Sequence, residues 1–128
     1  GYCAGQRLLG ATAVLDGESV YALDGPGAEL HGRSLVDGQS NDSDLEGADL
    51  TGAQLTRSRI SYSNLRGVDF TGADLTDMNL DHSDLTGSIG PGNGSGALVA
   101  SASGARCSDG ALVGTPGVTS CAGRGPGW

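Results

Sequence analysis

The side chains best suited to chemistry in this 128-residue chain are few and widely separated. The two histidines, His31 and His82, lie fifty-one residues apart. Asp42, Asp44 and Glu46 form an alternating acidic run whose oxygen atoms are of the kind that bind Ca²⁺. No nucleophile stands near a histidine in a pattern typical of catalysis. The sequence therefore predicts a protein that is not an enzyme, with no resident metal and no cofactor.

Three cysteines, Cys3, Cys107 and Cys121, are the other reactive groups. The last two lie in the Gly/Pro-rich segment RCSDGALVGTPGVTSC, which is able to fold back on itself. Sequence alone does not fix the pairing, so Cys3 with either partner, or free thiols in a cytosolic protein, are the alternatives.

The element that must position these groups is a five-residue repeat from Ser43 to Gly87. A large apolar residue stands at every fifth position, with a nearly always small residue two before it and polar residues between. This period is neither that of a helix nor that of a plain strand. We expect the large residues to form an inward core ladder: Leu45, Leu50, Leu55, Ile60, Leu65, Phe70, Leu75, Leu80 and Leu85.

A second period of twenty residues is nested in the first. SDLEG at 43–47, SNLRG at 63–67 and SDLTG at 83–87 match one another better than they match their neighbours. If four units make one lap, residues twenty apart stack, and opposite charges or threonines become favourable neighbours. The predicted pairs are Glu46 with Arg66, Arg57 with Asp77, Tyr62 with His82, Thr51 with Thr71 and Thr56 with Thr76, beside an inward column of Ser43, Ser63 and Ser83.

Over these residues the chain resembles the pentapeptide-repeat family, whose unit is commonly written A(D/N)LXX. The match is clear across 43–87, looser across 28–42 and absent from both ends. The resemblance implies an all-β fold, a right-handed quadrilateral parallel β-solenoid with irregular N- and C-terminal caps. It implies a fold more firmly than a function, since one fold serves many activities.

The repeat also sets the expected organisation. Residues 1–12 form an N-terminal cap, residues 13–89 the solenoid, regular from 28, and residues 90–128 a Gly-rich C-terminal cap and tail. Within the solenoid, the unit GQSND at 38–42 places Ser40 where leucine stands elsewhere, which predicts a bulge or a corner distortion near Gln39 to Asp42.

The C-terminal region changes character after Ile89. GPGNGSG at 90–96 predicts a turn or linker. Short apolar runs at 97–105 and 111–114 predict either a hairpin or an extra partial coil. Such a segment would cap the solenoid, whose ends otherwise present unpaired backbone groups.

The cysteine-bounded tail looks like the tails that follow the repeats in some secreted bacterial members of the family. That resemblance implies a Cys107–Cys121 disulfide, worth roughly 3 kcal/mol for a loop of about 15 residues, and leaves Cys3 as a candidate intermolecular thiol. Disulfides persist in oxidising compartments. We therefore expect a secreted bacterial protein, extracellular or at the cell surface. The start at Gly1 fits a processed secretory chain or a trimmed sequence.

Charge and hydropathy limit the classes of partner that we expect the chain to bind. Fifteen acidic residues against seven basic ones give a net charge of −8, which disfavours direct binding to nucleic acid. No apolar run approaches the twenty or so residues that a membrane span needs.

Two functions fit this pattern. The first is a non-enzymatic structural module that self-assembles, end to end through its coil edges, into a fibre or surface layer, with Trp128 as a candidate contact. The alternative is implied by the resemblance, because some family members are acidic rods that look like B-DNA and bind DNA gyrase, protecting it from toxins or quinolones.

Overall fold

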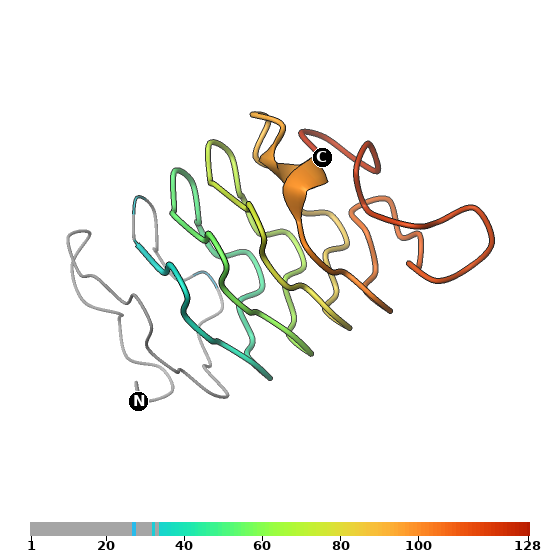
Figure 1. Ribbon diagram of the computed structural model, residues 1–128, viewed down its shortest axis with the longest axis horizontal. Helices are drawn as coiled ribbons and strands as arrows, with labels where there is room; N and C mark the ends of the chain where they lie inside the picture. Colours follow the sequence, from blue (N-terminus) through green and yellow to red (C-terminus); the bar gives the residue numbers. More distant parts are fainter. Residues whose placement is uncertain (1–26, 28–31, 33) are drawn as a thin grey trace.

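The computed structural model describes Gly27, Gly32 and residues 34–128, which wind as a solenoid of laps lying side by side (Figure 1). Parallel bridges join residues twenty apart, at every fifth residue from Ser34–Gln54 to Asp69–Ile89. This spacing confirms the twenty-residue lap. Every bridge is isolated, so the described residues contain no longer strand, and their one helix is the 3₁₀ helix η1, Ser95–Leu98.

The chain turns after each large apolar residue because the second residue beyond it adopts a left-handed conformation. Glycine fills that position in two of the four repeat units of a lap, as at Gly47 (φ 69°) and Gly52 (φ 66°). Other residues fill it in the remaining units, as at Arg57 (φ 57°) and Tyr62 (φ 54°). A left-handed conformation disfavours most side chains by about 1–2 kcal/mol, so stacking of the laps must hold these two turns in place.

The interior is one side chain wide. The small residue of each unit, such as Ala48 or Ala73, is fully buried beside the large one. None of the large apolar residues from Leu45 to Leu85 is more than 3% exposed: Leu45, Leu50, Leu55, Ile60, Leu65, Phe70, Leu75, Leu80 and Leu85.

The inward serine column is joined by hydrogen bonds between laps. The amide of Ser43 donates to Ser63 Oγ at 3.0 Å, and the amide of Ser63 donates to Ser83 Oγ at 3.1 Å. Each hydroxyl then donates to a carbonyl, Ser83 Oγ to Ile60 O at 2.7 Å. The column therefore satisfies backbone groups that would otherwise be buried without partners.

Replacing Ser63 with alanine is expected to lower the free energy of unfolding by about 1–3 kcal/mol, because the buried Ser43 amide loses its acceptor. Urea unfolding followed by circular dichroism measures the change. Ser103, whose side chain is exposed, supplies the matched Ser→Ala control. Equal stability of the two variants would contradict the role assigned to the column.

The bulge or corner distortion expected near Gln39 to Asp42 is absent, so that prediction is wrong: Asp42 has φ 56°, close to the φ 54° of Tyr62 one lap later. Gln39 keeps its parallel bridge to Arg59, and the Ser40 amide donates to the Arg59 carbonyl at 2.8 Å. The Asp42 amide also donates to the next lap, to Ser61 O at 3.0 Å. Serine changes the side chain in the slot but not the number of residues in the lap, so the backbone register is kept.

The stacking continues beyond Gly90 as an extra partial coil. Asn79 is bridged to Ser101 and Asp84 to Arg106, at spacings of twenty-two instead of twenty residues. The two additional residues fall in the segment that contains η1. From Arg106 the chain turns back, and Leu112 pairs with it in an antiparallel bridge.

Side chains replace the backbone bonds that this insertion removes. The Leu75 amide donates to Ser95 Oγ at 3.1 Å, where other laps use a carbonyl. The Ala73 carbonyl accepts Asn93 Nδ2 at 2.9 Å and Ser95 Oγ at 3.1 Å. The segment predicted to be a turn or linker thus belongs to the stack.

Candidate functional site

The acidic run singled out as a calcium candidate is used to shape the backbone. Asp44 Oδ1 accepts the Glu46 amide at 3.2 Å and Asn64 Nδ2 at 3.2 Å. Over the part of the chain that the structure describes, no group of three His, Cys, Asp or Glu side chains is placed to hold a metal ion. Asp42 is exposed at a left-handed corner.

Of the two histidines, His82 lies in the described part of the chain. His82 stacks on Tyr62, one lap away, with ring centroids 4.7 Å apart and an interplanar angle of 18°, which confirms that predicted pair. Gly104 continues the column, and a Cβ there would lie 2.5 Å from His82 Nδ1. His31 lies outside the described residues. His82 is therefore part of a surface stack.

The outer threonines form turns within a lap. In each Asp-x-Thr sequence, the aspartate Oδ1 accepts both the amide and the hydroxyl of the threonine, as for Asp74 with Thr76 at 3.0 and 2.6 Å. The same geometry holds for Asp49 with Thr51, Asp69 with Thr71 and Asp84 with Thr86. The hydroxyls of Thr51, Thr71 and Thr76 thus bond to aspartates of their own lap, whereas the Thr56 hydroxyl interacts with Asp74 of the next lap.

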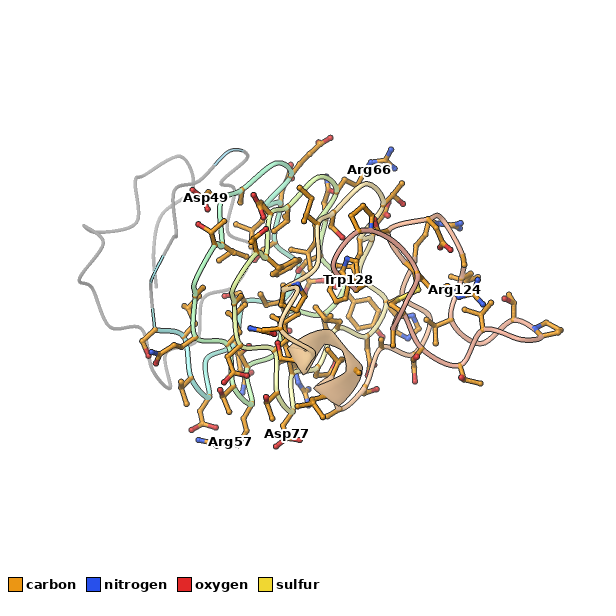
Figure 2. The ribbon with its side chains drawn as sticks, turned by 90° about the horizontal axis from the view of Figure 1, so that it is seen from above. Asp49, Arg57, Arg66, Asp77, Arg124 and Trp128 are labelled. Carbon is orange, nitrogen blue, oxygen red and sulfur yellow. A yellow bond between two sulfur atoms is a disulfide. The ribbon has the colours of Figure 1, made fainter. Side chains whose placement is uncertain are left out.

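The two predicted charge pairs are not the ones that form ion pairs at hydrogen-bond distance. Arg57 binds Asp37 at 2.8 Å, and the charge of Asp77, which Figure 2 shows beside it at the same edge of the coil, also attracts it. Arg66, at the opposite edge, pairs with Asp84 at 3.2 Å instead of Glu46. An arginine in a stacked column has a carboxylate within reach on either side, so side-chain geometry decides the pairing.

Acid is expected to destabilise the solenoid below about pH 4. Hydrogen bonds from the Thr76 hydroxyl and amide hold the pKa of Asp74 below its ordinary value, and Arg57 does the same for the pKa of Asp37. A carboxyl with a lowered folded-state pKa contributes stability above its unfolded pKa, and this contribution is lost as the pH falls through the folded pKa. Melting temperatures across the acid range measure the loss.

The Asp74→Asn variant tests which group is responsible. It has no carboxyl at that position to titrate, so its melting temperature should decline less steeply with acid than that of the wild type. Parallel curves for the two proteins would exclude Asp74 as a contributor.

The C-terminal cap is closed by a disulfide between Cys107 and Cys121, the pair that the resemblance implies, with Cα atoms 5.2 Å apart. Both cysteines are buried. Asp109 extends the closure, since its amide donates to the Arg124 carbonyl at 3.1 Å and its carboxylate lies 3.7 Å from Arg124 Nη1. The proposed intermolecular thiol, Cys3, lies outside the described residues.

Residues 125–128, which we call the tail, return to the end of the solenoid, where Trp128 lies beside η1 (Figures 1 and 2). The Trp128 ring meets Phe70 edge to face at 5.6 Å, and its Nε1 donates to Ser88 Oγ at 3.1 Å. The tail thus packs on its own coil. Whether Trp128 also contacts another molecule stays a prediction.

The position that receives the indole was overlooked in the sequence. SIGPG at 88–92 keeps the five-residue phase of the repeat and places Gly90 in the slot that Phe70 occupies one lap earlier and Leu50 two laps earlier. Gly90 is buried there without a side chain. The available signal was a glycine in a leucine slot, although nothing in the sequence shows that the single tryptophan would meet it.

A cavity of about 200 Å³ lies between the last coil and the disulfide loop. Its lining includes Leu80, Val99, Val113, Cys121 and Trp128. Ligand pockets usually measure about 300–1,000 Å³, so this space is too small for an ordinary cofactor. In the described part of the chain, no helix has the length and apolar character of a membrane span.

The repeat region of the chain matches a known protein family. The family described as "Pentapeptide repeats" matches residues 27–61 and 48–87 with eight copies. The solved structure of QnrB1, a plasmid-mediated fluoroquinolone resistance protein, superposes with a TM-score of 0.59 at 12% identity, covering 77% of this chain and 45% of that one. This chain thus spans less than half of the QnrB1 chain.

A second similar structure is the pentapeptide-repeat protein Rfr23 from the cyanobacterium Cyanothece 51142. Its TM-score is 0.58 at 15% identity, and the match covers 78% of this chain and 80% of that one. No curated protein sequence matches the chain. At these identities the structural likeness supports the fold, a right-handed β-solenoid.

Proposed function

The chain belongs to the pentapeptide-repeat family, and from that premise we propose that it is a non-enzymatic, self-associating structural module of an oxidising compartment. Proteins of this family are generally structural or binding proteins. The proposal includes secretion and a four-sided coil, which four bridge positions per twenty-residue lap support.

The observation that carries the proposal is the construction of the C-terminal cap. Its disulfide is buried, and loop and tail are held by paired backbone groups, such as Gly90 N with Pro126 O at 2.7 Å. Such a bond persists where the surroundings are oxidising. The buried side chains of the coil serve packing and backbone satisfaction, which favours a structural role over catalysis.

The cap also changes how self-association must proceed. End-to-end stacking needs free backbone groups at the coil end, but the tail occupies the amides of Gly90 and Gly92. Plain stacking of one coil on another is therefore obstructed at this end. Association there requires the tail to move or to take part.

Light scattering and negative-stain electron microscopy of protein exported from a bacterial host test the proposal. The expected result is oligomers or filaments whose amount rises with concentration, together with an intact Cys107–Cys121 disulfide. Protein that stays monomeric in every condition, or that accumulates reduced and folded in the cytosol, would contradict it.

Binding to DNA gyrase is the second candidate. It is supported by the net charge of −8 and by the structural likeness to QnrB1, a fluoroquinolone resistance protein. Pairing of Asp37 with Arg57 and of Asp84 with Arg66 offsets part of the negative surface. A supercoiling assay with and without a quinolone measures any protection, and no effect at micromolar protein would remove this candidate.

A further inference from the structure

We propose that the end of the coil is a recognition site for the Gly-Pro-Gly-Trp tail, and that the tail of a second copy enters it when two molecules associate. We call this site the coil-end seat and define it by Phe70, Ser88, Gly90, Gly92 and Gly96. The inference rests on the proposed self-association and names the contact that would carry it.

The tail binds the seat as an added stretch of solenoid backbone. The Gly90 amide donates to Pro126 O at 2.7 Å and the Gly92 amide to Gly127 O at 3.0 Å. These bonds resemble the one between ordinary laps in which the Gly72 amide donates to Pro91 O at 2.8 Å. Main-chain pairing of this kind is a general way for an edge to bind a peptide.

Close approach of two glycines makes the fit selective. A Cβ on Gly90 would lie 2.5 Å from the Gly127 carbonyl carbon, and the three nearest atoms it would meet all belong to Gly127 and Trp128. A Cβ on Gly127 would lie 2.6 Å from Gly90 O, and Gly127 has φ 76°, which also favours glycine. The seat therefore requires glycine before the tryptophan.

The indole supplies the side chain that the last lap lacks. It packs on Phe70 and donates from Nε1 to Ser88 Oγ at 3.1 Å. Its Cε3 would lie 3.1 Å from a Cβ on Gly96, so this face of the ring is also closely covered. Tryptophan thus meets an apolar partner and a hydrogen-bond acceptor in one place.

A second copy can offer the same tail to the same seat. Upstream, the chain is anchored by the contacts of Asp109 with Arg124, and the tail begins directly afterwards at Gly125 (φ 139°). Exchange of identical elements between copies conserves their contacts and is a low-cost route to dimers. The attached tail competes at a local concentration in the millimolar range, so exchange should increase with protein concentration.

A peptide experiment tests the seat alone. Acetyl-Gly-Pro-Gly-Trp is titrated into the Gly127→Ala, Trp128→Ala protein, whose own tail would clash with Gly90 and in which the peptide carries the only tryptophan, and its emission is recorded. We expect a blue shift that saturates, at least tenfold weaker binding of Gly-Pro-Ala-Trp, and no binding to a Gly90→Ala, Trp128→Ala protein. Equal binding of both peptides, or none, would overturn the site.

A mixing experiment tests exchange between copies. Gly90→Ala blocks the seat and displaces an intact tail, whereas Trp128→Ala leaves the seat without its indole. Neither should self-associate, but a mixture should form a heterodimer in which the single tryptophan shifts to the blue. Gln54→Ala is the control, because Gln54 is exposed and lies outside the seat, so the tail should stay in place and exchange should be unchanged.

The outcomes distinguish the seat, the exchange of tails between copies and the proposed function from one another. Peptide binding without a heterodimer would overturn exchange while leaving the seat. A wild-type protein that assembles although both experiments fail would keep the proposed function and remove this contact. Circular dichroism of each variant establishes that it is folded before mixing.

Discussion

Replacing Phe70 with alanine is expected to lower the free energy of unfolding by about 3–5 kcal/mol. Phe70 is fully buried among the large inward residues, and its ring packs edge to face against Trp128 with ring centroids 5.6 Å apart. Its loss would leave a cavity that the narrow coil cannot close, since the laps above and below are held by backbone bonds. Chemical unfolding measures the change, and Trp128 emission should shift to the red.

Leu98 supplies the control for Phe70. It is 54% exposed on η1, so Leu98→Ala should change stability by no more than about 0.5 kcal/mol. If Phe70→Ala and Leu98→Ala were equally stable, the one-residue-wide core would not be the source of stability that its burial indicates.

Removing the disulfide with Cys107→Ser and Cys121→Ser is expected to cost about 3 kcal/mol, within a range of about 2–5. The bond closes a sequence separation of 14 residues, and it holds the loop that carries the Asp109–Arg124 contact just before the tail. The variant should therefore lose stability and also release Trp128. Unfolding curves and tryptophan emission report the two effects separately.

Reductant is the control for that variant. In a Cys3→Ser background, which prevents exchange with the third cysteine, reductant should lower the stability of the oxidised protein to that of the double serine variant. It should leave the double serine variant unchanged. An oxidised protein with no more stability than its reduced form would contradict a structural role for the bond.

The five-residue spacing was enough to predict the solenoid, because each unit contributes one large inward residue and a lap contributes four. The twenty-residue lap followed from the likeness of 43–47, 63–67 and 83–87. Tyr62 over His82 was predictable for the same reason, since residues twenty apart stack. Periodicity is a local property, and it fixed the register wherever it was unbroken.

Features that depend on side-chain geometry or on distant complementarity were not predictable. Arg57 has an aspartate one lap before it and another one lap after it. The sequence does not show which of them forms the ion pair, and in the structure it is Asp37. Ser40 changed a side chain but left the lap length intact, so the expected bulge did not form. The fit of Trp128 over Gly90 joins residues without any shared repeat, and no pattern in the sequence connects them.

Sedimentation of the oxidised wild-type protein over a concentration series from micromolar to millimolar tests the central claim of self-association most directly. We expect an average mass that rises from the monomer value with concentration, and a loss of that rise in the Gly90→Ala variant. A wild-type mass that stays at the monomer value throughout the series would contradict it.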